Sequence, residues 1–64
     1  MPTVYLEKED KTVEVNELIV SEILKSLKIN PTTVIITKND ELILEESKLS
    51  KEDKITIIPV ISGG

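Results

Sequence analysis

The stretch that decides the fold is Lys54-Ile55-Thr56-Ile57-Ile58-Pro59-Val60-Ile61-Ser62-Gly63-Gly64. Its first half is rich in β-branched residues, which are typical of strands. Alternation along a strand predicts that Ile55 and Ile57 face a core, while Thr56 and Ile58 face away from it. We therefore expect this part of the stretch to be structural up to about Ile58.

The same stretch ends in features that a strand does not need. Pro59 has no N–H with which to extend a ladder at its own position, so we expect the backbone to leave the sheet there and residues 60–64 to form a flexible tail. Gly63 and Gly64 are the only glycines in the chain, and no turn, cap or bulge needs them at the end. A role outside folding is the favoured explanation. A disordered end or the remnant of a cloning tag is the alternative.

The composition describes one small acidic domain. The 64 residues suit a single domain, 1–64, with a small aliphatic core. Cysteine and histidine are absent, which excludes disulfides and thiolate or imidazole metal ligands. The net charge of −4 disfavours nucleic acid as a partner. Without a signal-like start or an apolar run of membrane length, we expect a monomeric cytoplasmic protein that does not contact membranes.

The first fifteen residues predict a β-hairpin. Residues alternate from Thr3 to Glu7, four charged residues interrupt at 8–11, and alternation resumes from Thr12 to Val15. The expected buried face consists of Val4, Leu6, Val13 and Val15.

A helix of about three turns is expected next. Its apolar residues recur at helical spacing, and Asn16 is a candidate N-terminal cap. Asn30 and Pro31 should end the helix, because Asn tolerates the left-handed conformation common after helices and Pro cannot continue one. The expected apolar face is Ile19, Val20, Ile23, Leu24 and Leu27.

The second half of the chain predicts three more strands. Residues 32–37 read as a central strand covered to some degree on both faces, 38–41 as a polar turn and 42–44 as a short returning strand. Leu49 is expected to anchor the charged loop 45–53, which closes with a capped turn at 50–53. We interpret the acidic pairs at 45–46 and 52–53 as solvated loop charge and not as metal ligands.

The order of elements is therefore strand, strand, helix, strand, short strand, strand, which suits an α+β domain with one helix on a mixed sheet of four to five strands. With this order, the Val60-Ile61-Ser62-Gly63-Gly64 end resembles the ubiquitin-like sulfur carriers ThiS and MoaD and the small archaeal modifier proteins, and is nearest to ThiS and the archaeal modifiers. Weaker support comes from Thr12-Val13-Glu14-Val15, the Leu24 and Leu27 helix, and Asn39-Asp40-Glu41. The resemblance implies a β-grasp fold with the first and last strands side by side.

The resemblance also implies a chemistry. An adenylating enzyme of the ubiquitin-activating type uses ATP and magnesium to activate the carboxylate of Gly64, with Gly63 and Ser62 threaded into its channel. Glycine suits a narrow channel because it has no Cβ. The protein itself is then a substrate or carrier with no catalytic residue, no bound cofactor and no metal. Nothing follows Gly64, so no processing step is expected.

Two fates of the activated carboxylate remain open. The favoured one is a protein modifier joined to lysines of target proteins and removed by a zinc-dependent isopeptidase. The alternative is a dedicated sulfur carrier, which takes sulfur from a donor protein as a thiocarboxylate for thiamine, molybdopterin or tRNA thiolation. Some members of the superfamily do both, and a β-grasp module that is never activated is a third possibility.

Two further sets of residues carry weaker hypotheses. Scattered exposed aliphatic residues are common in small proteins. A cluster beside the tail would nevertheless suit an enzyme that holds the domain. By strand parity the outward set, and so the candidate docking surface, is Tyr5, Ile35, Ile43, Ile58 and Ile61. Any lysine is a possible acceptor if chains form: Lys8, Lys11, Lys25, Lys28, Lys38, Lys48, Lys51 or Lys54.

Overall fold

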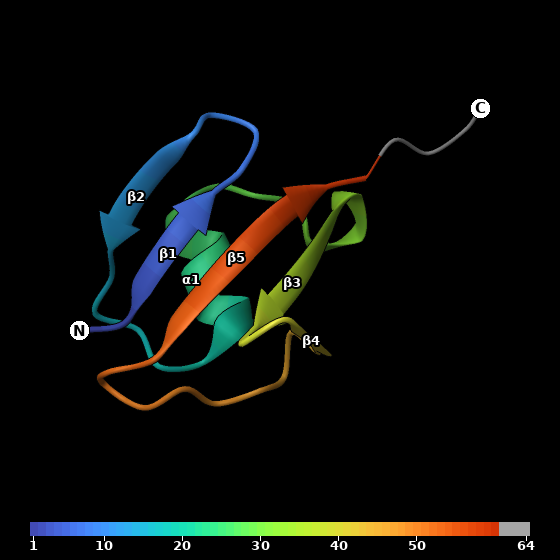
Figure 1. Ribbon diagram of the computed structural model, residues 1–64. Coiled ribbons are helices and arrows are strands. Elements are labelled where there is room, and N and C mark those ends of the chain that lie inside the picture. The colour runs from blue at the N-terminus through green and yellow to red at the C-terminus, as the bar shows by residue number, and fades with distance from the viewer. Residues whose placement is uncertain (61–64) are drawn as a thin grey trace.

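A computed structural model describes residues 1–60 of the protein. The elements in chain order are β1 (Thr3–Leu6), β2 (Lys11–Glu14), α1 (Val20–Ser26), the 3-10 turn η1 (Pro31–Thr33), β3 (Val34–Lys38), β4 (Glu41–Ile43) and β5 (Lys54–Pro59). They form one five-stranded sheet in the order β2-β1-β5-β3-β4, with β1 and β5 parallel and the other pairs antiparallel (Figure 1). The α+β, β-grasp prediction is confirmed.

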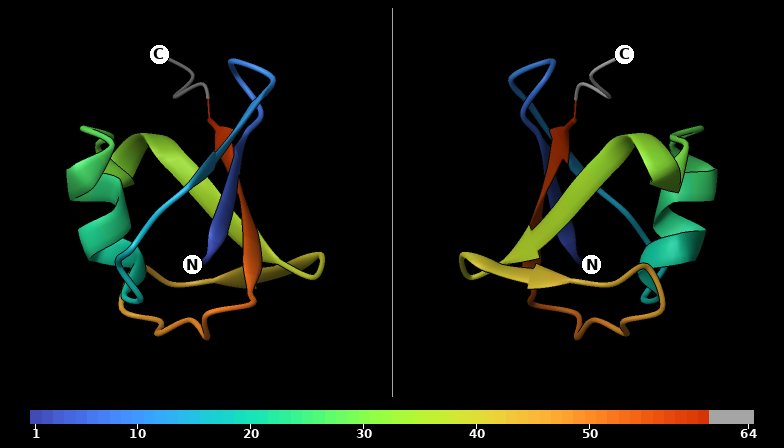
Figure 2. Two further views of the ribbon diagram at one scale, coloured as in Figure 1. Left: turned by 90° about the vertical axis from the view of Figure 1, so that its left-hand side faces the viewer. Right: turned by 90° about the vertical axis from the view of Figure 1, so that its right-hand side faces the viewer.

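The molecule has two layers, because α1 packs on one face of the twisted sheet (Figure 2). Ile55 and Ile57 of β5 point into the space between the layers, as their alternation predicts, and Val4 lies beside Ile55 on β1. Aliphatic burial of this kind is the main stabilising term for a chain without disulfides. The buried core consists of Val4, Leu6, Val15, Val20, Ile23, Leu24, Ile36, Leu49, Ile55 and Ile57.

The helix begins later than its apolar spacing predicts and has two turns instead of three. The N-cap position is Ile19, which makes no side-chain cap bond, so the prediction that Asn16 caps the helix is wrong. The loop after β4 satisfies the first N–H groups instead: Val20 donates to the carbonyl oxygen of Ser47, and Ser21 donates to that of Glu45. These carbonyls do what a capping side chain does elsewhere.

The end of α1 is also built differently from the prediction. Lys28, with φ 59°, takes the left-handed conformation expected of Asn30, and the Ile29 N–H donates to the Leu24 carbonyl oxygen at 2.8 Å. Left-handed backbone followed by such a bond is a common helix ending. Asn30 has φ −79° and caps η1, because its Oδ1 accepts from the backbone N–H of Thr32 at 3.0 Å.

The hairpin of β3 and β4 is closed by two residues with positive φ, Asn39 at 53° and Asp40 at 66°. Positive φ at both central positions matches the twist of paired strands and fixes their register. β3 starts at Val34, later than expected, since Thr32 and Thr33 lie in η1. Ile36 is buried and Ile35 is 38% exposed, so the outer face of this strand is covered only in part. Within residues 1–60, no helix is long and apolar enough to cross a membrane.

Candidate functional site at the end of β5

The last described residues of the chain are held by β3. The Val60 N–H donates to the Thr33 carbonyl oxygen at 3.0 Å, and Pro59 lies opposite Val34. In an antiparallel pair, hydrogen-bonded and non-bonded positions alternate. The nitrogen of Pro59 therefore points away from β3, and the missing N–H does not interrupt this side of the ladder.

On its other side, β5 loses its partner at the proline. The Glu7 N–H donates to the Ile57 carbonyl oxygen at 3.1 Å, so the next bond of the parallel ladder would need an N–H at position 59. Proline cannot supply it. The Glu7 carbonyl oxygen instead accepts from Asp10 in the β1–β2 turn, at 3.3 Å. Proline thus ends the pairing with β1 but not the pairing with β3.

β5 ends at Pro59, where we expect the backbone to leave the sheet, but Val60 is still attached through its bond to Thr33. The predicted tail-threading and activation residues, Ser62, Gly63 and Gly64, lie outside the described residues, as does Ile61. What the structure shows is the support that precedes them: an anchored strand that brings the chain to one end of the domain (Figure 1).

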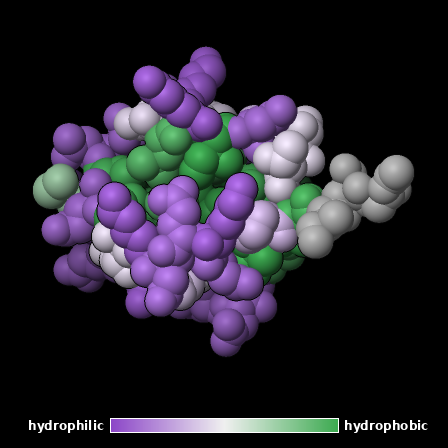
Figure 3. Space-filling view, turned by 90° about the horizontal axis from the view of Figure 1, so that it is seen from above, coloured by the Kyte–Doolittle hydropathy of each residue, from purple (hydrophilic) through white to green (hydrophobic). Residues whose placement is uncertain are grey.

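An apolar groove of about 340 Å³ opens beside this support. Leu6, Ile29 and Ile57 contribute apolar lining, and Val60 forms part of its wall. Seen from this end, the groove is a hydrophobic hollow surrounded by hydrophilic side chains (Figure 3). Its lining includes charged and polar residues but no arrangement of nucleophile and base, so it suits contact with another surface better than catalysis.

Three of the predicted docking residues lie on the sheet face opposite the helix. Ile35 of β3 and Ile58 of β5 stand directly opposite each other, and Tyr5 lies on β1, the other neighbour of β5. The Tyr5 hydroxyl donates to Oδ1 of Asp10 at 2.5 Å, and this hydrogen bond to a carboxylate raises the pKa of Tyr5. The contact ties the tyrosine to the β1–β2 turn.

Ile43 does not belong to this outer face. It pairs with Ile36, which is buried, and packs against the core from the helix side, so the parity prediction for Ile43 is wrong. Leu42 and Leu44, which the prediction passed over, are exposed instead, at 70% and 65%. The two-residue turn could have predicted the orientation of Ile43. If the strand pairing is counted outward from that turn, residue 43 falls opposite residue 36 and so on the same face of the sheet.

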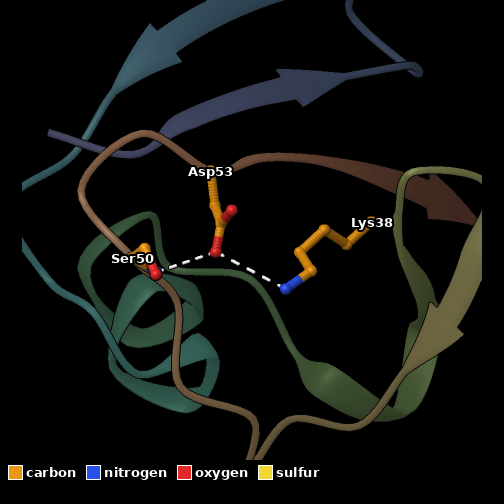
Figure 4. Close-up of polar contacts among 3 residues, drawn as sticks. All are labelled: Lys38, Ser50 and Asp53. Atoms are coloured by element: carbon orange, nitrogen blue, oxygen red, sulfur yellow. Dashed lines mark hydrogen bonds and ion pairs between the residues drawn. The ribbon is translucent and has the colours of Figure 1, made fainter.

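Asp53, one member of the acidic pair at 52–53, has a structural role. Oδ2 of Asp53 accepts from the backbone N–H of Ser50 at 2.7 Å and lies 3.5 Å from Nζ of Lys38 (Figure 4). The Ser50 hydrogen bond, assisted by the lysine charge, lowers the pKa of Asp53. The predicted capped turn at 50–53 is thus confirmed, as is Leu49, which is buried. Among residues 1–60, no three acidic side chains gather closely enough to hold a metal ion.

A β-grasp domain whose last strand precedes a Gly-Gly pair defines a class, the ubiquitin-like sulfur carriers and modifiers. Within it, this chain belongs to the ThiS family, whose family model matches residues 3–64. It is similar to the sulfur carrier protein TtuB of Thermus thermophilus, with 37% identity over 43 residues, covering 67% of this chain and 66% of that protein, just under two thirds of its length. It is also similar to an uncharacterized protein of Archaeoglobus fulgidus, with 38% identity over 58 residues, 91% of this chain and 85% of the other.

Proposed function

We propose that this protein carries sulfur on the carboxylate of Gly64 after an adenylating enzyme has activated that carboxylate. The observation that carries the proposal is the ThiS family match, which extends through residue 64 and so includes the Gly-Gly pair. The anchored β5 strand supports it, since a carrier needs a rigid body that presents its reactive end. The protein is a carrier and not itself an enzyme.

The first step consumes ATP. A carboxylate oxygen of Gly64 attacks the α-phosphorus, pyrophosphate leaves, and a mixed anhydride with AMP forms. The enzyme supplies magnesium, which neutralises the charge on the phosphates. Gly63 and Gly64 suit this step because residues without Cβ allow the backbone to lie close to the nucleotide in a narrow channel. ATP places the reaction in the cytoplasm.

In the second step, a sulfur nucleophile from a donor protein attacks the carbonyl carbon and AMP leaves. The attacking atom is the outer sulfur of a persulfide on the donor, so an acyl disulfide joins the two proteins. A thiol then attacks the donor's sulfur and forms a disulfide with it, and the S–S bond to the acyl group breaks to leave a thiocarboxylate on Gly64. The Thermus relative is a sulfur carrier protein by name, which favours this fate of the activated carboxylate. The order of the two hypotheses is therefore the reverse of the one that the sequence alone suggested.

Conjugation to proteins is the second candidate. The same mixed anhydride reacts with a lysine amine to form an isopeptide bond, with AMP again as the leaving group. A zinc-dependent isopeptidase would then reverse the modification. The Gly-Gly end is the feature that favours this candidate, because ubiquitin-like modifiers share it with sulfur carriers.

Mass spectrometry of the protein isolated from its own cells distinguishes these fates. We expect a population of intact chains heavier by the difference between one sulfur and one oxygen atom, which alkylation of the thiocarboxylate would confirm. Tryptic peptides of other proteins bearing a remnant of this chain's end on lysine would instead establish conjugation. Finding neither product in cells that contain the adenylating enzyme would contradict both fates.

The outer sheet face is the surface that we propose for docking of the adenylating enzyme. This face carries an apolar surface on β5 and on its two neighbours, β1 and β3. The surface is formed by Tyr5, Ile35 and Ile58. Ile61, the remaining member of the predicted set, comes two residues after the last residue of β5 in the sequence. Ile43 is removed from the set because it packs against the core.

A further inference from the structure

A second groove, of about 390 Å³ and with both apolar and polar lining, lies along β4 and η1. Pro31, Ile35, Leu42 and Leu44 contribute apolar surface to it. Leu42 and Leu44 are also the most exposed aliphatic residues of the sheet and its flanks. β4 is an edge strand, at the opposite side of the sheet from β2 (Figure 1).

The groove forms where the chain stops pairing with β3, which happens after Ile43 at the end of β4. From there the chain runs to the start of α1, where the carbonyl oxygens of Glu45 and Ser47 accept from the first N–H groups of the helix. This cap separates residues 44–46 from β3 and leaves Leu44 uncovered. The opening is thus a consequence of how the helix is capped, and it is built into the fold.

The backbone of β4 adds hydrogen-bonding groups to the same edge. Lys38 and Glu41, which flank the two-residue turn, form a hydrogen-bonded pair, and such pairs alternate with non-bonded ones along the hairpin. The N–H and C=O groups of Glu41 and Ile43 therefore point toward β3, and those of Leu42 point outward. An outward N–H and C=O pair on an edge strand is a template for an added strand. The groove and this edge therefore favour an extended occupant.

The charges around the groove indicate which charge the bound segment should carry. Glu45 and Glu46 line the groove, Glu41 lies on β4 itself, and all three are exposed. The lining residues, all within 1–60, include no lysine. A second copy of this chain would bring the same three carboxylates against themselves, which is unfavourable. A basic segment would pair with them.

We propose that the β4 edge and its groove bind an extended protein segment in which aliphatic and basic residues alternate. Its backbone pairs with Leu42, its aliphatic side chains enter the groove, and its cations face Glu45 and Glu46. β4 pairs with the half of β3 that lies beside the start of β5, away from Val60.

The test uses the full chain, labelled with ¹⁵N, and a blocked synthetic peptide in which valine and lysine alternate. We expect saturable shifts of the amide resonances of residues 42–46, which weaken as salt is added. The double variant Glu45→Lys/Glu46→Lys should bind at least about tenfold more weakly, since two favourable charge contacts become repulsive.

Two controls keep this test specific. The variant Glu14→Lys/Glu52→Lys makes the same change in net charge away from the groove and should bind within about twofold of the unaltered protein. A peptide with glutamate in place of lysine should not bind. The proposal is overturned if the two peptides bind alike, if the shifts fall on the outer face or at the β5 end, if both double variants weaken binding equally, or if the chain dimerises through β4.

Discussion

At the scale of single residues, Asp53 makes stability depend on pH. Its folded pKa lies below the ordinary value of 3.8, chiefly because the Ser50 N–H donates to the carboxylate. A depressed pKa means that the ionised form stabilises the fold. That contribution is complete above the unfolded pKa and is lost as the pH falls through the folded one.

Asp53→Asn should therefore have a lower melting temperature than the unaltered protein near neutral pH, and the gap should close as the pH falls below the unfolded pKa. Thermal melts followed by circular dichroism across this range measure it. Glu52→Gln, in the next residue of the same loop, is the matched control and should follow the unaltered protein. A gap that stays constant with pH would show that the Asp53 charge contributes nothing.

Strand alternation predicted the orientation of some side chains correctly, but it failed for Ile43. Alternation placed Ile55 and Ile57 correctly, because β5 pairs on both sides and its faces differ sharply in burial. β4 has three residues, too few for alternation to define a face. Its orientation depends on the register that Asn39 and Asp40 impose, so turn geometry was the better guide.

At the scale of elements, β5 contributes to both faces of the sheet, since Ile57 is buried in the core and Ile58, on the outer face, is not buried. Ile58→Asp places a charge on the proposed docking face without disturbing the core. We expect adenylation by the activating enzyme to fall about tenfold or more through KM, because a buried apolar contact in the complex becomes an unpaired charge.

Steady-state kinetics of pyrophosphate release measure this effect, and circular dichroism checks the fold. Ser26→Asp adds the same charge at an exposed position of α1, in the other layer, and serves as the control. Unchanged kinetics for Ile58→Asp, or equal losses for both variants, would rule out docking through Ile58.

Helix α1 marks the limit of prediction from local sequence. Its apolar spacing identified Val20, Ile23 and Leu24, which are buried. Its start could not be predicted locally, because the groups that satisfy its first N–H donors are backbone carbonyls more than twenty residues later in the chain. Capping by side chains leaves a sequence signal, whereas capping by a distant backbone does not.

At the scale of the whole molecule, we propose separate tasks for the end of β5 and for the β4 edge. Strand order and two-layer packing followed from the sequence once the resemblance had placed β1 beside β5, because periodicity alone does not order strands. The β4 groove was not predictable, since it arises from the path of residues 44–47 toward the helix. The reactive carboxylate, by contrast, was proposed from the sequence alone.

The most direct test of the central claim compares the full chain with one lacking Gly64 in ATP–pyrophosphate exchange by the adenylating enzyme of the same organism. Deletion moves the carboxylate by about 3.5 Å along an extended chain. Misplacement by about 1 Å already costs roughly a hundredfold in such reactions, so exchange should fall by at least that factor. The melting temperature should not change, because the core ends at Ile57. Exchange within about twofold of the full chain would contradict activation at Gly64.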